Sequence, residues 1–251
     1  NGNLDKIKAL YLVSYFSNPS GHCVSEKVKS DIGSLLSRQK APIAVIEDAA
    51  YRELYYQHPF ESRSTVVLES FNQLPVLYTS TLTKPYASGL KVGYAYCSNT
   101  KWLNSMLSVK GKQDFGTANF AQAILEYALA SGRFDTHLTS LRGLYQSKMV
   151  TLHESLGDSL KSLGWEWEEP KGGLYLWLKS PNEMRTDGES QFHKSCIENG
   201  VFYVPGNLCH HGNEIRSRIR LSFGSLNLAD IREAANRFLA AAESMAVSAI
   251  T

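Results

Sequence analysis

The sequence predicts an α/β fold: a mostly parallel sheet with flanking helices, followed by a smaller α+β domain. The first half of the chain holds short, almost continuously apolar runs, several of which end in a polar residue. An amphipathic helical pattern separates two of these runs, which is typical of parallel strands that are covered on both faces. The last part alternates short strand-like runs with helical patterns. We therefore expect two domains, residues 1–140 and 141–251.

The strands of the first domain are expected at five apolar runs. These runs are ALYLVSYF (9–16), APIAVIEDAAY (41–51), STVVLES (64–70), LPVLYTST (74–81) and LKVGYAYC (90–97). Between the first two, residues 25–39 form a helical pattern that Ser25 can cap, with Val28, Ile32, Leu35 and Leu36 on one face. Ligands of open parallel sheets bind beyond the carboxyl ends of the strands, so Asn18, Asp48 and Lys84 should share one edge.

Helical sequence follows, and then the second domain. A helix is expected at 119–132, ending at Gly132, and a long one at 136–163, ending at Gly164, which would connect the two domains. Beyond it we expect strands at 165–170, 172–180, 200–206 and 216–224, a helix at 189–199, and a final helix with an apolar stripe. The aromatic residues of GGLYLWL (172–178) are expected in the core of this domain.

Composition points to a small-molecule partner. The 251 residues include 26 Lys and Arg against 24 Asp and Glu, a formal charge of +2 that argues against a nucleic-acid surface. Cys23, Cys97, Cys196 and Cys209 lie far apart without a CxxC pair, which favours reduced thiols. No apolar run reaches the ~18 residues of a membrane span. We expect a cytoplasmic protein with no membrane or nucleic-acid partner.

Lys84 is the residue that suggests chemistry. A lysine amine becomes a nucleophile when its charged form is disfavoured, and it then condenses with a carbonyl group. Lys84 follows a predicted strand and is flanked by the small hydroxyl residues Thr81 and Thr83. Together with an aspartate, a tyrosine and an asparagine at the same edge, it suits a cofactor that needs imine chemistry. The alternative, a solvated lysine in a loop, is equally compatible with the spacing alone.

Six segments make the interpretation specific. They are SNPSG (17–21), IEDAAYRELYY (46–56), STLTKPYASGLKVGY (80–94), PKGGLYLWL (170–178), YVPG (203–206) and IRLSFG (219–224). In this order they resemble the class I/II aminotransferases of the fold-type I pyridoxal-phosphate superfamily. The resemblance implies that residues 1–140 are the C-terminal part of the cofactor-binding large domain and that residues 141–251 are the small domain.

The resemblance implies a role for each matching position near the cofactor ring. Lys84 is similar to the lysine that holds pyridoxal 5'-phosphate as a Schiff base and then moves the substrate proton. Asp48 is similar to the carboxylate that keeps the pyridine nitrogen protonated, so that the ring accepts electrons. Tyr51 and Asn18 resemble the pair that hydrogen-bonds the phenolic oxygen. Without the resemblance, Tyr51 reads as a core aromatic residue and Asn18 as an Asx turn. Glu47 competes with Asp48, but as its strand neighbour it should point to the other face, as a supporting or surface acid.

The remaining positions concern the cofactor phosphate and the substrate. Thr81 and Thr83 resemble the hydroxyl residues that bind the phosphate, although β-propensity alone also explains them. Lys91 stands where the family usually has an arginine, and it supplies charge without the bidentate fork. Arg220 resembles the arginine that clamps the substrate α-carboxylate. Arg216 and Arg218 share its strand face, and only the IRLSFG match selects Arg220.

A metal site is the weaker interpretation of LCHHGNE (208–214). Cys209, His210 and His211 are adjacent, so their side chains project in different directions, and no further ligands have the spacing that zinc needs. We expect no metal there, and interpret the segment as a loop beside the active-site entrance.

The predicted function is an aminotransferase that moves an amino group between an amino acid and a 2-oxo acid through Lys84. Members of this family are longer, and the chain starts without methionine, so we expect a truncated chain with reduced or no activity alone. We also expect a homodimer, which is usual in the family. Two alternatives stay open: an aminotransferase-like effector domain of a transcription regulator, and a lyase or synthase on the same scaffold.

Overall fold

The computed structural model describes residues 6–211 and 217–248, and the chain divides into two compact units. The first unit contains the described residues up to Ser17 together with His22–Leu141. The second contains Asn18–Gly21 and the described residues from Arg142 onward. The main division falls between residues 141 and 142, and the short Asn18–Gly21 turn belongs to the second unit.

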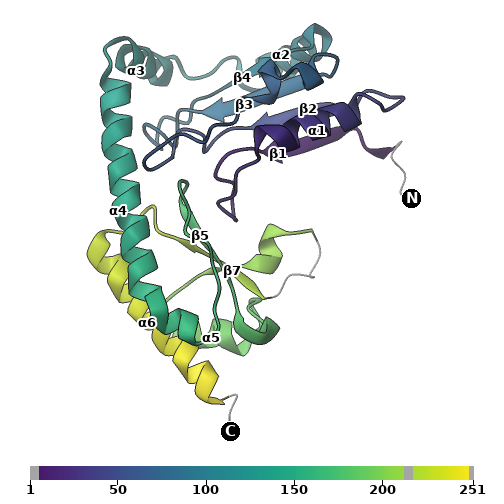
Figure 1. Cartoon of the computed structure of the whole chain (residues 1–251). Coiled ribbons are helices and arrows are strands. Elements are labelled where there is room, and N and C mark those ends of the chain that lie inside the picture. Colours follow the sequence, from purple (N-terminus) through teal and green to yellow (C-terminus); the bar gives the residue numbers. More distant parts are fainter. Residues whose placement is uncertain (1–5, 212–216, 249–251) are drawn as a thin grey trace. The chain divides into compact units, whose positions relative to one another are not determined.

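The first unit is built on a four-stranded sheet (Figure 1). Strands β1 (Ala9–Val13), β2 (Ala44–Asp48) and β3 (Val76–Thr81) are parallel, and β4 (Gly93–Cys97) pairs antiparallel with β3, in the order β1-β2-β3-β4. The register sets Asp48 beside Val13 on one side and Thr79 on the other. This mostly parallel sheet with flanking helices confirms the predicted α/β fold class.

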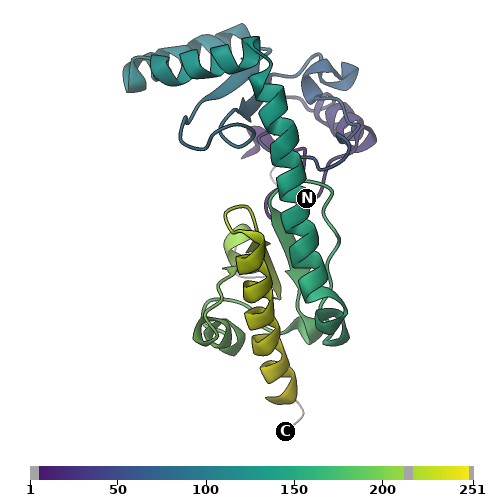
Figure 2. The same ribbon diagram turned by 90° about the vertical axis from the view of Figure 1, so that its left-hand side faces the viewer.

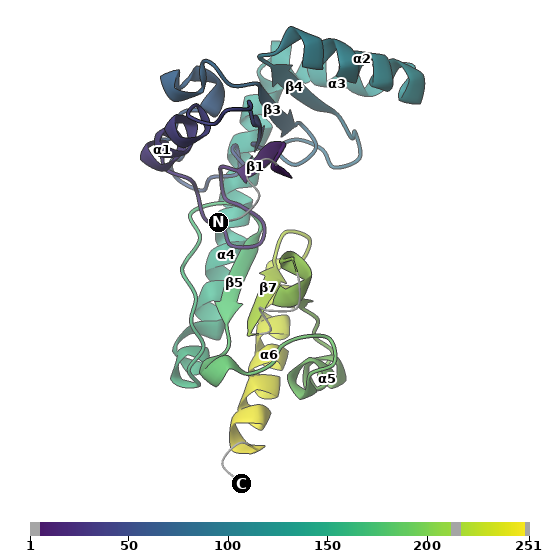
Figure 3. The same ribbon diagram turned by 90° about the vertical axis from the view of Figure 1, so that its right-hand side faces the viewer.

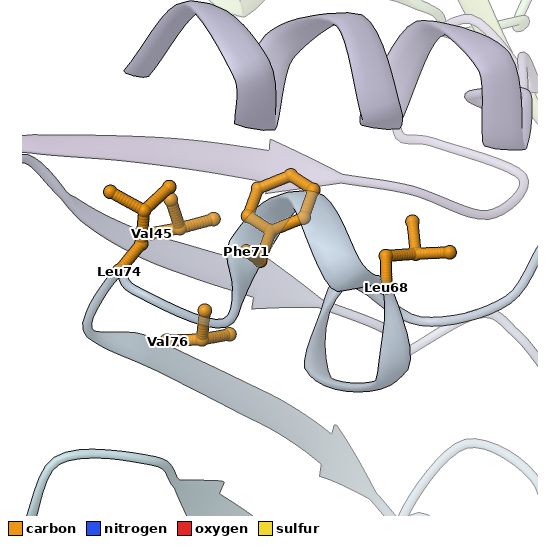
Figure 4. Packing of buried hydrophobic residues seen from close by; sticks show 5 residues of the cluster. All are labelled: Val45, Leu68, Phe71, Leu74 and Val76. Atoms are coloured by element: carbon orange, nitrogen blue, oxygen red, sulfur yellow. The ribbon is translucent and has the colours of Figure 1, made fainter. Parts of the chain in front are cut away.

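Helix α1 (Glu26–Leu36) packs on one face of this sheet. The Ser25 hydroxyl caps it by accepting the Val28 N–H at 3.3 Å. Ile32 and Leu36 of α1 pack on a buried cluster of five residues: Val45, Leu68, Phe71, Leu74 and Val76 (Figure 4). A Cβ on Gly33 would lie 2.9 Å from the Phe71 ring, so the glycine permits this close approach. Val28 and Leu35, which the pattern placed on one face with Ile32 and Leu36, are exposed.

The prediction of a strand at residues 64–70 is wrong. The segment forms two short 3-10 turns, η2 (Thr65–Val67) and η3 (Glu69–Phe71). Ser64 caps η2, and the Thr65 N–H donates to the Glu47 side chain at 2.8 Å. These polar groups are therefore satisfied by a carboxylate on β2 rather than by a neighbouring strand.

Three helices follow the sheet. Helix α2 (Thr100–Asp114) was not predicted; it has no buried residue, so its sequence has no apolar stripe. Helix α3 (Asn119–Ala130) packs through Ala121 and Leu125 against Val92. Helix α4 (Arg133–Ser162) is the long helix that was expected (Figure 2). Gly157 interrupts its regular geometry. Residues 133–141 of α4 belong to the first unit and the rest to the second.

The second unit has a three-stranded antiparallel sheet in the order β5-β7-β6. The strands are β5 (Tyr175–Lys179), β6 (Val204–Pro205) and β7 (Arg218–Ser222). Besides its part of α4, the unit contains helices α5 (Gln191–Glu198) and α6 (Leu228–Ser248) (Figure 3) and the 3-10 turns η4 (Pro181–Glu183) and η5 (Gly206–Cys209). Phe192 of α5 and Phe238 of α6 have ring centroids 5.5 Å apart, and both contact Trp165.

The strand predicted at 165–170 is also wrong, because this segment forms only one isolated bridge, between Glu166 and Lys179. Across the described ranges, no helix has the length and apolar character needed to cross a membrane.

Candidate active site

Lys84 and the segment that begins at Asp48 meet at the carboxyl edge of the first sheet. Strand β2 ends at Asp48, and the Ala49 N–H donates to the Thr79 carbonyl of β3 at 2.9 Å, which holds the two strand ends together. The Lys84 Nζ lies 4.8 Å from the centroid of the buried Tyr51 ring. This is cation–π distance. Among the described residues no carboxylate forms an ion pair with Lys84.

Asp48 is half-buried, and its carboxylate accepts hydrogen bonds from two donors. Its Oδ1 accepts the Ala50 N–H at 2.9 Å, and its Oδ2 accepts the hydroxyl of Tyr11, a residue of β1. A carboxylate has about four acceptor positions, so these two bonds leave room for a further donor. Tyr11 was not among the predicted site residues. On its own, a tyrosine in a strand is explained by β-propensity, so the sequence held no signal for this contact.

Glu47 points to the opposite face of β2, as predicted, but it is a buried residue and not a surface acid. Both Glu47 and Lys29 of α1 have no exposed surface, and Lys29 Nζ lies 3.0 Å from Glu47 Oε1. Glu47 Oε2 accepts from the Ser64 hydroxyl and from Thr65. Burial raises the pKa of the Glu47 carboxyl, but the Ser64 hydrogen bond and the Lys29 charge outweigh it and hold the pKa below its ordinary value.

The two predicted phosphate threonines converge on one carbonyl group. The Thr81 hydroxyl donates to the Val92 oxygen at 3.2 Å and the Thr83 hydroxyl at 3.4 Å, while the Thr83 N–H donates to Thr81 Oγ1 at 3.0 Å. Each hydroxyl must therefore turn away from Val92 to donate to a phosphate. Lys91, next to Val92, is exposed and has a left-handed backbone with φ of 54°.

Arg220 and Asn18 come together in the second unit. The Arg220 Nη1 donates to Asn18 Oδ1 at 2.7 Å, and the guanidinium carbon lies 4.5 Å from the centroid of the Tyr175 ring. The Arg220 Nε is buried and, among the described residues, has no hydrogen-bond partner. A buried donor without a partner is costly, and a carboxylate ligand would satisfy it.

Two expectations around Arg220 have different outcomes. Arg218 and Arg220 are partly exposed while Ile219 and Leu221 are buried, as the alternation along β7 predicts. Arg216 lies outside the described residues. The predicted burial of the GGLYLWL aromatics is wrong: Leu176 and Leu178 enter the core, whereas Tyr175 and Trp177 are partly exposed. The reason is that this strand has large apolar side chains on both faces, so alternation alone cannot select the buried one.

The cysteine and histidine residues form no metal centre in the part of the chain that the structure describes. No group of three or more His, Cys, Asp or Glu side chains is placed to hold an ion there. The four cysteines are free thiols, and Cys209 lies in η5. Residues 212–214 of the LCHHGNE segment lie outside the described residues.

Comparison with known proteins identifies the family. The family model described as aminotransferase class I and II matches residues 3–238. A curated relative, the HTH-type transcriptional regulator NorG of Staphylococcus aureus, is 26% identical over 230 residues, which cover 91% of this chain and 49% of the regulator. Aromatic-amino-acid aminotransferase 1 of Thermococcus litoralis is 24% identical over 233 residues, 92% of this chain and 53% of the enzyme.

A solved structure agrees with these relatives. LysN, the α-aminoadipate aminotransferase of Thermus thermophilus in complex with N-(5'-phosphopyridoxyl)-L-leucine, superposes with a TM-score of 0.81 at 25% identity. The match covers 94% of this chain and 59% of LysN. The chain thus spans about half the length of the curated relatives it matches.

Proposed function

Because the chain belongs to the aminotransferase class I and II family, we propose that it binds pyridoxal 5'-phosphate and moves an amino group between an amino acid and a 2-oxo acid. The single observation that carries the proposal is the position of Lys84: its amine lies over Tyr51, unpaired with any described carboxylate, at the sheet edge where Asp48 ends β2. In this proposal the first unit is part of the cofactor-binding large domain and the second is the small domain.

The residues present fit this cofactor. Lys84 supplies the amine for the aldehyde carbon, and Asp48 keeps free acceptor positions for the pyridine N–H. Tyr51 and Asn18 are the proposed donors to the phenolic oxygen, and the Asn18 amide NH₂ stays available because Arg220 occupies only its oxygen. Thr81, Thr83 and Lys91 are proposed to bind the phosphate, for which the two hydroxyls first release Val92.

Each residue has a defined task in the proposed reaction. Bound pyridoxal phosphate supplies an electron sink that stabilises negative charge at the substrate Cα. Asp48, as an anion, keeps the proton on the ring nitrogen. Lys84 holds the cofactor through a carbon–nitrogen bond and, when its amine is free, carries a proton to and from the substrate Cα. Arg220 holds the α-carboxylate with its planar fork.

Covalent trapping tests the proposed role of Lys84. The chain is mixed with pyridoxal phosphate, reduced with borohydride and digested, and the cofactor mass is expected on the peptide that contains Lys84. Lys84→Ala should remove this adduct, whereas Lys101→Ala, a lysine at the start of α2, should leave it unchanged. An adduct spread over many lysines, or one that persists in Lys84→Ala, contradicts the proposal.

The second candidate function is a ligand-binding effector domain of a transcription regulator. The observation that favours it is the match to NorG over 91% of this chain. The two candidates share the cofactor adduct but differ in turnover. Incubation with amino acids and 2-oxo acids, followed by analysis of the keto and amino products, tests this difference: product formation supports the aminotransferase and rules out a domain that only binds its ligand.

We also propose that the chain forms a homodimer, in keeping with the family resemblance. Exposed apolar side chains in the first unit support this assembly: none of the described α2 residues is buried, and Phe115, just after α2, is 94% exposed. Phe120 at the start of α3 is also exposed. Large exposed apolar side chains are candidates for contact with a second copy of the chain. Sedimentation equilibrium of the chain, compared with Phe115→Ser/Phe120→Ser, tests the proposed dimer.

A further inference from the structure

Tyr11 lies outside the matching segments and contacts the proposed cofactor machinery at Asp48. It lies in β1, opposite Ile46 in the register, and Asp48 is two residues further along β2. Residues two apart in a strand share a face, so Tyr11 and Asp48 are diagonal neighbours on the same side of the sheet. The Tyr11 hydroxyl spans this diagonal and donates to Asp48 Oδ2.

We propose that Tyr11 is a positioning residue that fixes the Asp48 carboxylate, as an anion, in the orientation that receives the pyridine N–H of the cofactor. The inference rests on the proposed function. The Ala50 N–H holds Oδ1 and the Tyr11 hydroxyl holds Oδ2, so both oxygens are fixed from the protein side. Both groups donate, so each carboxylate oxygen is held by one hydrogen bond while further acceptor positions stay open for the ring N–H.

The chemistry of the phenol agrees with this contact. Partial burial, the hydrogen bond to Asp48 and the charge of that carboxylate together raise the pKa of Tyr11 to about 12. The Tyr11 hydroxyl therefore keeps its proton and acts as a donor throughout the neutral range. The side chain is 58% exposed, so the burial of apolar surface gives little reason for a large aromatic ring at this position.

Tyr96 of β4 offers a matched control. It is a strand tyrosine in the same unit, 55% exposed, and within the described ranges its hydroxyl makes no hydrogen bond to a carboxylate. Tyr96→Phe therefore removes the same atom from a similar environment. The change seen in Tyr96→Phe gives the general effect of removing a phenolic oxygen from an exposed strand, and it is subtracted from the change seen in Tyr11→Phe.

The first experiment needs no cofactor. The full chain is labelled with ¹³Cζ-tyrosine, and Tyr11→Phe and Tyr96→Phe assign the two resonances. At neutral pH the Tyr11 resonance is expected to differ from that of Tyr96 and to move toward it in Asp48→Asn, because the substitution removes the charged oxygen that accepts the Tyr11 hydroxyl. A Tyr11 resonance that is identical in the parent chain and in Asp48→Asn overturns the contact.

The second experiment measures pyridoxal phosphate affinity by absorbance titration. Tyr11→Phe is expected to weaken binding roughly three- to tenfold, as for a partly exposed hydrogen bond to a charged group. In the Asp48→Asn background the same substitution should change nothing, because Tyr11 acts through Asp48. Tyr96→Phe should have no effect in either background, and circular dichroism confirms that each variant is folded.

The outcomes separate the inference from the proposed function. If the parent chain binds the cofactor and Tyr11→Phe binds it equally well, the positioning role is wrong and the proposed function stands. An equal loss in both backgrounds means that Tyr11 acts on structure and not through Asp48. If the parent chain shows no binding at all, the proposed function fails, and the positioning role fails with it even where the tyrosine resonance confirms the contact.

Discussion

The two neighbouring acids of β2 have opposite surroundings. On the α1 face, Glu47 is fully buried, paired with Lys29 and supplied with donors by Ser64 and Thr65. On the other face, Asp48 is half-buried and has two donors, Ala50 and Tyr11, for about four acceptor positions. A fully buried acid that is paired with a lysine stabilises the fold, while a half-buried acid with vacant acceptor positions is available to a ligand. The contrast predicts that substitutions on the Glu47 face change stability and that substitutions on the Asp48 face change ligand binding.

The largest effect on stability is expected from Lys29→Met. The methionine keeps the apolar part of the side chain but leaves the Glu47 charge buried without a partner, which costs about 3–5 kcal/mol of the free energy of unfolding. Lys29 also donates to the Tyr15 hydroxyl at 3.1 Å and to the Arg63 carbonyl at 2.9 Å, so two further acceptors lose a donor. Urea unfolding, followed by circular dichroism, measures the loss.

Lys27→Met is the control for this prediction. Lys27 lies on the same helix, and its pair with Asp31 is on the surface, where ion pairs contribute little. The control should unfold close to the parent chain. If the two substitutions are equally mild, the Glu47 face is not the stabilising one and the contrast between the two acids is wrong.

Much of the fold could be predicted from the sequence because burial leaves a direct signal. The strands β2 and β3 each begin with a run of apolar residues, and the long helix α4 repeats apolar residues with helical spacing. Helix α2 escaped prediction because none of its residues is buried. The 64–70 segment has the β-branched residues of a strand, but its polar groups are bound by Glu47, a partner that lies seventeen or more residues away in the chain.

Some residues of the candidate site could be predicted from the sequence and others could not, for a similar reason. Lys84, Asp48 and Arg220 stand in segments whose order resembles a family, so their positions could be inferred from the sequence alone. Tyr11 could not, because its significance comes from a diagonal contact between two strands and not from its neighbours in sequence. The Lys29–Glu47 pair is of the same kind: the amphipathic pattern of α1 predicted a helix there but gave no reason to bury a lysine.

A double substitution tests the buried Lys29–Glu47 pair, with an expected change in the free energy of unfolding that is smaller than that of Lys29→Met. In Lys29→Met/Glu47→Gln the buried charge is gone, and the Gln oxygen still accepts from Ser64 and Thr65. The double variant should therefore recover at least about 1 kcal/mol relative to Lys29→Met alone. If the loss of stability in the double variant equals the sum of the losses in the two single variants, Lys29 and Glu47 act independently. The measurement is the same urea unfolding series, analysed as a double-mutant cycle.

The pH dependence of stability follows from the lowered pKa of Glu47. A carboxyl whose folded pKa lies below its unfolded value of 4.5 stabilises the fold above that pH, and the contribution is lost as the pH falls from 4.5 through the folded pKa. Glu26, whose pKa Arg63 lowers to about 2, contributes in the same direction.

The double variant Lys29→Met/Glu47→Gln separates the contribution of Glu47 to this pH dependence from that of Glu26. Glu26 remains in Lys29→Met/Glu47→Gln, so the difference between this variant and the parent chain isolates the buried pair. From about pH 5.5 down to about pH 3, the stability of the parent chain should fall more steeply than that of the variant. Parallel curves would show that Glu47 titrates with its ordinary pKa.

The smallest effect on stability is expected from Asp48→Asn. The amide keeps an oxygen for the Ala50 N–H and loses the charge and the oxygen that accepts the Tyr11 hydroxyl, both at a half-buried position, so the free energy of unfolding should fall by about 1 kcal/mol or less. Binding of pyridoxal phosphate should fall much more, because a neutral amide cannot pair with a protonated ring nitrogen. Urea unfolding and absorbance titration of the same sample give both numbers. A destabilisation as large as that of Lys29→Met would show that Asp48 is also a structural acid, and the two faces of β2 would no longer differ in the way their contacts imply.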